Sequence, residues 1–350
     1  MTDMNKTKKR KLEHLDVCAN KDVETGTTWL EHCQFVPDTL TEVNPIDVDT
    51  STMLLGKKLA APLVISAITG GVEEAGKINK ELAGVAEELG IGFGVGSQRA
   101  MIEDKSTWKT FHVRKEAPNT LVLGNIGAVN DYSPKQIFKA MEDIGADAMC
   151  MHLNVAQELA QPEGDKTFSH CLKNIENAVS GGVPVVAKET GAGISRESAL
   201  KLKAAGVSAI DVGGSGGANW IKIENLRGKK AYTPIHWGIP TAASILECQV
   251  GTPLISTGGI RSGMDMAKCI ALGADSAGVA LPVLRWYYEG GKDLVAEELG
   301  HWITELRSIM VLTGSKDIQE LKKANIVITG PLFDWCEVRG IDISQLGRRD

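Results

Sequence analysis

The sequence predicts an α/β protein folded as a closed (β/α)8 barrel of the TIM-barrel type, with an N-terminal cover segment and a C-terminal extension. From about residue 60 onward, eight short apolar runs alternate with segments of helical period. Each run is continuously apolar, which is typical of parallel strands covered on both faces. Eight strands joined by helical crossovers fit a closed barrel. An open doubly wound sheet is the alternative, and the count of eight favours the barrel.

The predicted strands are the apolar runs at 61–68, 90–96, 120–127, 147–153, 183–189, 207–214, 252–259 and 274–280. Predicted helices follow them at 74–90, about 106–116, 133–145, 169–181, 195–206, 240–249, 263–273, 281–291 and 293–313. Ser133 and Ser195 are expected to cap their helices, and Pro134 suits a first helical turn. We therefore expect a cover segment at 1–60, a barrel at 61–314 and an extension at 315–350.

Composition narrows the class of protein. The chain has 350 residues, of which 43% are hydrophobic, enough for a large buried core. A net charge of −6 argues against a general nucleic-acid binder. No apolar run approaches the roughly 18–20 residues of a membrane span, and the basic N-terminus lacks the apolar segment of a signal peptide. The seven cysteines lack CxxC spacing, which indicates reduced thiols in a cytoplasmic protein without a zinc site.

Glycine and polar residues gather where the predicted strands end. In a (β/α)8 barrel these carboxyl ends carry the active site, and a phosphate site commonly follows strands seven and eight. Gly258 and Gly259 come there, before a predicted helix, and Arg261 adds a positive charge. Backbone N–H groups at a helix start suit a phosphate. The alternative is that the glycines only form a tight turn.

Two further strand ends carry chemistry. Lys188 ends an apolar run, so it could serve as a Schiff-base nucleophile, a general base or a positive charge beside an electron-accepting ring. A lysine extending to the barrel mouth is the structural alternative. The fourth strand ends in His152, Asn154, Gln157 and Glu158. Glu158 could hold magnesium together with substrate phosphates, or could be a solvated loop residue.

The ordered motifs resemble the type 2 isopentenyl-diphosphate isomerase family of FMN-dependent barrel enzymes. The resemblance covers about residues 9 to 335. It rests on Arg10-Lys11-x-x-His14, Ala67-Ile68-Thr69-Gly70-Gly71, Gly96-Ser97-Gln98-Arg99, Gly124-Asn125, His152-x-Asn154-x-x-Gln157-Glu158, Lys188-Glu189-x-Gly191 and Gly258-Gly259-Ile260-Arg261. Before this resemblance is used, the basic stretch at 8–14 could equally be a disordered tail.

The resemblance implies an isomerase that interconverts isopentenyl and dimethylallyl diphosphate in isoprenoid biosynthesis, with reduced FMN, magnesium and NADPH as the flavin reductant. It implies catalytic roles for Gln157 and His152, and a metal role for Glu158. The substrate would be bound by Arg10, Lys11, His14, Ser97, Arg99, Asn154 and Gln157. The FMN would be bound by Ala67, Ile68, Thr69, Ser97, Asn125, Lys188, Gly259, Ile260, Arg261, Ala280 and Leu281. It also implies a homo-oligomer, a tetramer or octamer, with no nucleic acid or membrane partner.

One loop departs from the family pattern. After the sixth strand the family carries a hydroxyl residue that contacts the FMN phosphate, and here Ala218 stands at that position. Ser215 or Asn219 could substitute for it, or backbone N–H groups could suffice.

Two other classes of protein compete with the isomerase. An FMN-dependent 2-hydroxy-acid oxidoreductase would need a histidine base at the ends of the last strands, and none occurs there. A dehydrogenase of the inosine-monophosphate type would need a cysteine within 213–238, which contains none. A non-catalytic phosphate- or flavin-binding barrel would not need so many functional side chains on one rim.

Overall fold

The computed structural model describes residues 3–228 and 234–348, and side chains from residue 9 onward. Eight parallel strands close into a barrel, in the order β10-β11-β4-β5-β6-β7-β8-β9. They are β4 Leu63–Ile65, β5 Gly92–Gly94, β6 Val122–Gly127, β7 Ala148–Leu153, β8 Val185–Glu189, β9 Ala209–Asp211, β10 Leu254–Ser256 and β11 Ser276–Val279. The predicted barrel is confirmed, with strands shorter than the apolar runs because each run extends into a loop.

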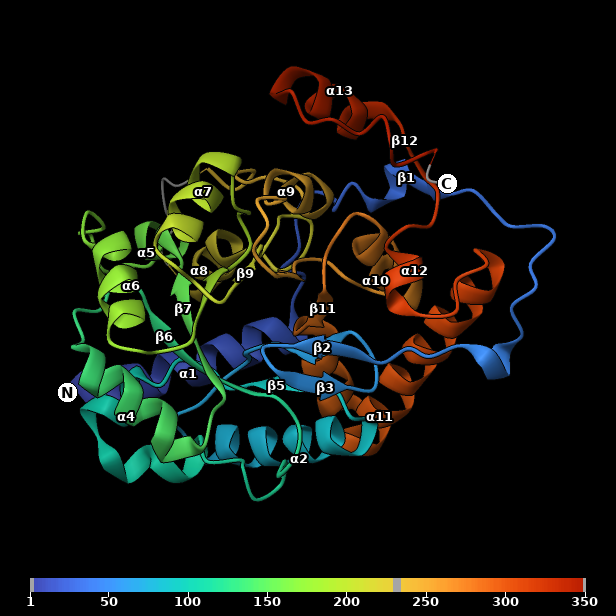
Figure 1. Ribbon diagram of the computed structural model, residues 1–350. Coiled ribbons are helices and arrows are strands. Elements are labelled where there is room, and N and C mark those ends of the chain that lie inside the picture. Colours follow the sequence, from blue (N-terminus) through green and yellow to red (C-terminus); the bar gives the residue numbers. More distant parts are fainter. Residues whose placement is uncertain (1–2, 229–233, 349–350) are drawn as a thin grey trace.

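Helices surround the barrel (Figure 1). They are α2 Glu73–Leu89, α3 Arg99–Glu103, α4 Pro134–Ile144, α5 Val155–Ala160, α6 Cys171–Ser180, α7 Arg196–Ala204, α8 Trp220–Arg227, α9 Thr241–Glu247, α10 Gly263–Ala271 and α11 Leu281–Leu312. Ser133 caps α4 in a capping box with Pro134 in its first turn, and Ser195 caps α7, as predicted. Gly291 interrupts α11 with φ of 70°, at the predicted break between two helices.

One predicted helix is wrong. The segment at 106–116 contains only the 3-10 helix Lys105–Thr110, and the chain then turns irregularly. Phe111 and Val113 lie there with no exposed surface, packed into the main core. The buried residues here alternate along the chain and do not recur with a helical period. Packing against the rest of the protein, and not the local pattern, therefore decides the conformation of this segment.

The hydrophobic core has two layers. Side chains inside the barrel form one cluster, and the larger cluster lies between the strands and the helices. The antiparallel hairpin of β2 Thr52–Leu54 and β3 Lys57–Leu59 places Leu54 and Leu59 in the inner cluster, beside Leu121 and Ala148. These partners precede or begin barrel strands, so the hairpin closes the amino-terminal end of the barrel.

The two ends of the chain cover other parts of the barrel. Helix α1 Asp3–Asn20 packs against α8 and α11. Strand β1 Cys33–Phe35 pairs antiparallel with β12 Ile326–Ile328 of the C-terminal part. The C-terminal part also contains α12 Ile318–Leu321 and α13 Gly330–Arg339, which lies beyond the helical ring in Figure 1. The buried carboxylate of Glu247 on α9 accepts hydrogen bonds from Trp335 and Arg339 and so fastens α13 to the barrel.

The burial of the cysteines and the character of the helices both concern the class of protein. Six of the seven cysteines are buried and Cys171 is partly exposed. Among residues 3–228 and 234–348, no helix combines the length and apolar character needed to cross a bilayer.

Candidate active site

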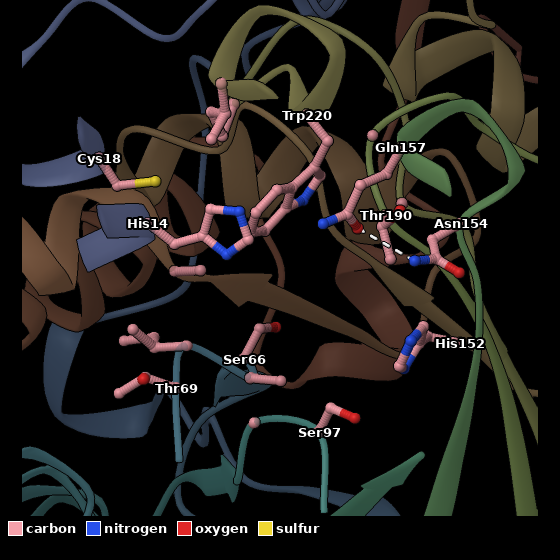
Figure 2. A pocket seen from close by; sticks show the side chains of 18 of the residues that line it. His14, Cys18, Ser66, Thr69, Ser97, His152, Asn154, Gln157, Thr190 and Trp220 are labelled. Atoms are coloured by element: carbon pink, nitrogen blue, oxygen red, sulfur yellow. Dashed lines mark hydrogen bonds between the residues drawn. The ribbon is translucent and has the colours of Figure 1, made fainter. Parts of the chain in front are cut away.

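A cavity of about 290 Å³ opens at the carboxyl ends of the barrel strands. Figure 2 shows side chains from α1, from the β4 and β5 ends and from the β7 and β9 loops converging on it. Every residue that the sequence assigned to catalysis, substrate, cofactor or metal lines this cavity: Arg10, Lys11, His14, Ala67, Ile68, Thr69, Ser97, Arg99, Asn125, His152, Asn154, Gln157, Glu158, Lys188, Gly259, Ile260, Arg261, Ala280 and Leu281. Residues separated by up to 271 positions therefore meet at one site.

Helix α1 closes one side of the cavity. Arg10, Lys11, His14, Leu15 and Cys18 line it, and their spacing of three and four residues places them on one helical face. The basic stretch is thus helical from residue 3 to 20 rather than a disordered tail. It lies over the barrel of its own chain.

Lys11 is the most perturbed cation of the site. Its Nζ donates to the Ser97 carbonyl at 3.2 Å and lies 5.3 Å from the centre of the Phe111 ring. Burial, with the positive charge of Arg10 as a second cause, lowers the pKa of Lys11 to about 7. An anion arriving beside Lys11 would restore its proton.

His14 is fixed by a carboxylate. Its Nε2 lies 2.8 Å from Oε1 of Glu224, whose side chain is fully buried. Burial lowers the pKa of His14 despite this partner. Burial would raise the pKa of Glu224, but the hydrogen bond from His14 and the positive charge of Arg227 oppose it, and the net effect lowers that pKa. A neutral imidazole therefore donates to an ionised carboxylate, and its ring meets Trp220 edge-on, with centroids 5.1 Å apart.

His152 is a neutral, oriented side chain. Its Nδ1 lies 2.7 Å from the Asn125 amide oxygen. Burial, followed by the charges of Lys188 and Lys11, lowers the pKa of His152 to about 4. At neutral pH the ring is therefore uncharged, and its Nδ1–H donates a hydrogen bond to the Asn125 amide oxygen.

The loop after β7 arranges an amide and a carboxylate. Asn154 Nδ2 donates to Gln157 Oε1 at 3.1 Å and to Glu158 Oε1 at 2.9 Å. The second Glu158 oxygen accepts from the Asp165 N–H at 2.7 Å. Because its oxygen is held by Asn154, Gln157 directs its amide nitrogen into the cavity (Figure 2). The loop thus presents donors from Gln157 beside an ionisable carboxylate.

Lys188 sits at the floor of the cavity and is already paired. Its Nζ lies 2.9 Å from Oδ2 of Asp211, 3.4 Å from the Thr257 hydroxyl and 3.1 Å from the Glu189 carbonyl. The neighbouring Glu189 carboxylate turns away, because it accepts from the N–H groups of Thr190 and Gly191. Burial raises the pKa of Glu189 to about 7 although these backbone bonds oppose it.

Glycine backbone forms another part of the cavity wall, directly after Thr257. Gly258 and Gly259 have φ of 103° and 75°, which side chains rarely adopt. A Cβ added to Gly217 would lie 2.4 Å from the Gly259 nitrogen, so two loops meet with no room for side chains. The N-terminus of α10 follows, where Ser262 accepts from the Asp265 N–H. This cradle of backbone beside a helix start fits the phosphate of a cofactor.

Side-chain groups contribute little to that cradle. Ala218 lines the cavity, whereas Ser215 and Asn219 do not. Asn219 instead caps α8 by accepting from the Lys222 N–H at 2.9 Å. Arg261 lines the cavity but is ion-paired with Glu24 of the cover segment. Neither suggested hydroxyl or amide substitute reaches the site, which leaves the backbone N–H groups.

Two carboxylates line the cavity, Glu158 and Glu163, and Glu163 is ion-paired with Arg227. Among the described residues, no group of three or more His, Cys, Asp or Glu side chains is placed to enclose a metal. Glu158 therefore suits an ion such as magnesium, which keeps several waters or substrate phosphates as ligands.

The sequence reasoning missed Trp220 and Asp211. Trp220 lines the cavity beside His14, and it is the first residue of α8, directly after the glycine-rich loop that follows β9. Reading that loop to its last residue would have found it. Asp211 ends β9 within an apolar run, and only its register opposite Lys188 reveals its importance.

Comparison with known proteins gives a consistent result. The chain matches the FMN-dependent dehydrogenase family over residues 5–152 and 161–328. The isopentenyl-diphosphate delta-isomerase of Methanosarcina acetivorans is 44% identical over 97% of both chains. That of Aeropyrum pernix is 45% identical over 96% of this chain and 94% of its own, and that of Archaeoglobus fulgidus is 45% identical over 95% and 99%.

Solved structures support the fold. A mandelate oxidase variant is 20% identical, covers 94% of this chain and all of its own, and superposes with a TM-score of 0.64. A flavocytochrome b2 variant is 18% identical, covers 97% of this chain and 84% of its own, and has a TM-score of 0.67. At these identities the likeness concerns architecture alone. Family match, full-length identity and architecture agree that this chain belongs to the FMN-dependent dehydrogenase family and, within it, to the isopentenyl-diphosphate delta-isomerases.

Proposed function

We propose that this protein interconverts isopentenyl and dimethylallyl diphosphate, using bound reduced FMN and magnesium. The observation that carries the proposal is that every residue to which the resemblance assigned a role lines one cavity, together with the glycine cradle. The relatives named above carry the same activity in their names. The proposal includes a cytoplasmic location, a homo-oligomer and NADPH as the reductant of the flavin.

The diphosphate end lies between α1 and the loops after β5 and β7. Arg10, Lys11 and Arg99 supply positive charge there, with His14, Ser97, Asn154 and Gln157 as further donors or contacts. The Arg99 guanidinium is held by Glu103 at 2.8 Å and Asp165 at 3.4 Å. Glu158 would ligate magnesium, and the chemistry that the ion supplies is neutralisation of diphosphate charge.

The carbon chain would then extend toward Trp220, between the α1 face and the floor of the cavity. Gln157 directs an amide N–H into this space, and we propose it as the group that orients the reacting chain. We propose His152 in the same reaction through Asn125, since a neutral ring can hold that amide in one orientation. Leu15, Cys18 and Trp220 give this space an apolar lining that would exclude water from the reacting carbons.

The FMN would occupy the space between Lys188 and the glycine cradle. Its contacts would come from Ala67, Ile68, Thr69, Ser97, Asn125, Lys188, Gly259, Ile260, Arg261, Ala280 and Leu281. The chemistry that reduced FMN supplies when bound is proton exchange and stabilisation of positive charge on a nearby alkene carbon. Lys188 favours a negatively charged ring by Coulomb attraction.

Oxidation of a 2-hydroxy acid is the second candidate, because mandelate oxidase shares the architecture. A histidine base near the last strands would carry that reaction, but 254–281 contain no histidine. The cation-rich α1 face also suits a diphosphate better than one carboxylate.

The test is anaerobic turnover of isopentenyl diphosphate in deuterated water, with FMN, magnesium and NADPH. We expect dimethylallyl diphosphate that carries deuterium, formed only after the flavin is reduced. A matched reaction with oxidised flavin is the control. Bound, reducible FMN without any product would overturn the isomerase, and hydroxy acids would be the next substrates.

A further inference from the structure

We propose that Asp211 is a positioning residue that fixes Lys188 at the cavity floor, partly neutralises its charge and thereby sets the reduction potential of the bound flavin. The inference rests on the proposed flavin site. It does not depend on the isomerisation itself.

The carboxylate of Asp211 is held at both oxygens. Oδ2 lies 2.9 Å from Lys188 Nζ, and the side chain is 4% exposed. Oδ1 accepts from the Thr257 hydroxyl and, at 3.3 Å, from the Gly213 N–H. Thr257 also lies 3.4 Å from Lys188 Nζ, so the three side chains form one connected group. A carboxylate bonded in this way has a single orientation, and it gives the lysine one position.

Strand register creates this group. Lys188 on β8 is paired with Asp211 on β9, and Ile255 on β10 is paired with Asp211 from the other side. Thr257, two residues beyond Ile255, therefore points to the same face of the sheet as Ile255. Three neighbouring strand ends thus supply an ammonium, a carboxylate and a hydroxyl within the barrel.

Lys188 and Asp211 lie at different places relative to the cavity. Lys188 lines both the large cavity and a small inner cavity of about 10 Å³, whereas Asp211 lines only the inner one. An occupant of the large cavity would therefore meet Lys188 but not Asp211. Asp211 therefore does not contact that occupant, and Lys188 is the charged side chain that lies between them.

No other carboxylate competes for this role among the described residues. Asp211 alone forms an ion pair with Lys188, because Glu189 is occupied by the backbone of its own loop. His152, opposite Lys188 on β7, is neutral near pH 7. In a buried site a positive charge beside the flavin favours its negatively charged reduced form, and a carboxylate in contact with that charge weakens the effect.

The experiment measures the reduction potential of FMN in the holoenzyme, by anaerobic equilibration with a reference dye. Asp211→Asn keeps the shape and removes the negative charge. We expect reduced FMN to gain at least tenfold in affinity relative to oxidised FMN, which raises the potential by about 30 mV for a two-electron couple. Asp147→Asn is the matched control, because Asp147 pairs with Arg114 at the opposite end of the barrel; its potential should equal that of the wild type.

A double variant tests whether the effect of Asp211 on the potential depends on Lys188. In a variant that also carries Lys188→Met, Asp211→Asn should raise the reduction potential by less than it does in the wild-type background. An unchanged potential in Asp211→Asn, or an equal rise with and without Lys188, would overturn the proposal. Asp211→Ser removes the same charge if Asp211→Asn does not fold. Loss of folding or of FMN binding in both would assign Asp211 to stability or cofactor affinity and also overturn it. Failure of the wild type to bind FMN would instead refute the proposed function.

Discussion

The two ends of the cavity offer an anion different kinds of positive charge. The glycine cradle offers backbone N–H groups and a helix start, and its arginine, Arg261, is already paired with Glu24. The α1 end offers the side chains of Arg10, Lys11 and Arg99, and Lys11 has a pKa of about 7. Backbone dipoles do not titrate, whereas buried ammonium groups do. One end is therefore expected to hold its ligand at any pH, and the other to depend on protonation.

The largest effect should come from removing the side-chain charges. Arg10→Ala combined with Lys11→Ala should lower kcat/KM for isopentenyl diphosphate about 1000-fold, since each charge-assisted hydrogen bond contributes roughly 2 kcal/mol. FMN affinity should stay the same, because the cradle is untouched. Lys9→Ala is the control, since Lys9 is exposed on the same helix and its ion-pair partner among the described side chains is Glu13. Unchanged kinetics in the double variant would contradict a substrate role for α1.

Glu158→Gln should be next in size. We expect turnover at saturating FMN to fall on the order of 100-fold, together with the loss of its magnesium dependence, while FMN still binds. Titration of activity with magnesium measures both. Glu163→Gln, which changes another carboxylate of the cavity, tests the assignment. If the magnesium dependence disappears in that variant instead, the metal ligand is Glu163.

The pH dependence separates the two ends directly. Lys11 carries its charge below about pH 7 and loses it above, so kcat/KM should fall about tenfold per pH unit above pH 7. Lys11→Ala should abolish this alkaline limb, and FMN affinity should show no such limb. A wild-type profile that is flat from pH 7 to 9 would refute the low pKa.

Lys11 should affect stability in the opposite direction to activity: as pH rises above about 7, kcat/KM should fall while the free energy of unfolding should rise. Folding lowers the pKa of Lys11 from 10.5 to about 7, so the unfolded chain binds more protons between these values. The contribution of Lys11 to the free energy of unfolding therefore rises with pH across this window. Urea unfolding of the wild type and Lys11→Ala at pH 7 and 9 measures the difference.

The smallest effect should appear at the cradle. Ala218→Ser adds a hydroxyl at the position where the resemblance leads us to expect one, and a single hydrogen bond of about 1 kcal/mol should tighten FMN binding roughly fivefold. Ala205→Ser on the outer surface of the barrel serves as the control, because Ala205 ends α7 away from the cavity. Fluorescence titration of apoprotein with FMN measures the affinity. Weaker binding in Ala218→Ser would show that the close backbone packing leaves no room for the added atom.

Most of the fold could be predicted from local sequence patterns. Each barrel strand is a short apolar run and each following helix has its own period and caps, so neighbouring residues contain the information. The strand ends could then be located, and the fold rule that these ends share one rim placed Asn125, His152, Lys188 and Gly259 together. The helix predicted at 106–116 was wrong because Phe111 is buried against residues distant in the sequence and not on the apolar face of a helix.

The sequence by itself determined the barrel, its polar rim and half of the residues that line the cavity, but not Trp220. Only the tertiary structure decided that α1 covers its own barrel, that Glu24 pairs with Arg261 and that Asp211 pairs with Lys188. The physical reason is separation along the chain. Glu24 and Arg261 are 237 positions apart, and a single aspartate in an apolar run looks the same whether it meets a lysine or not. Strand register and helix packing, which no local pattern encodes, bring these charges together.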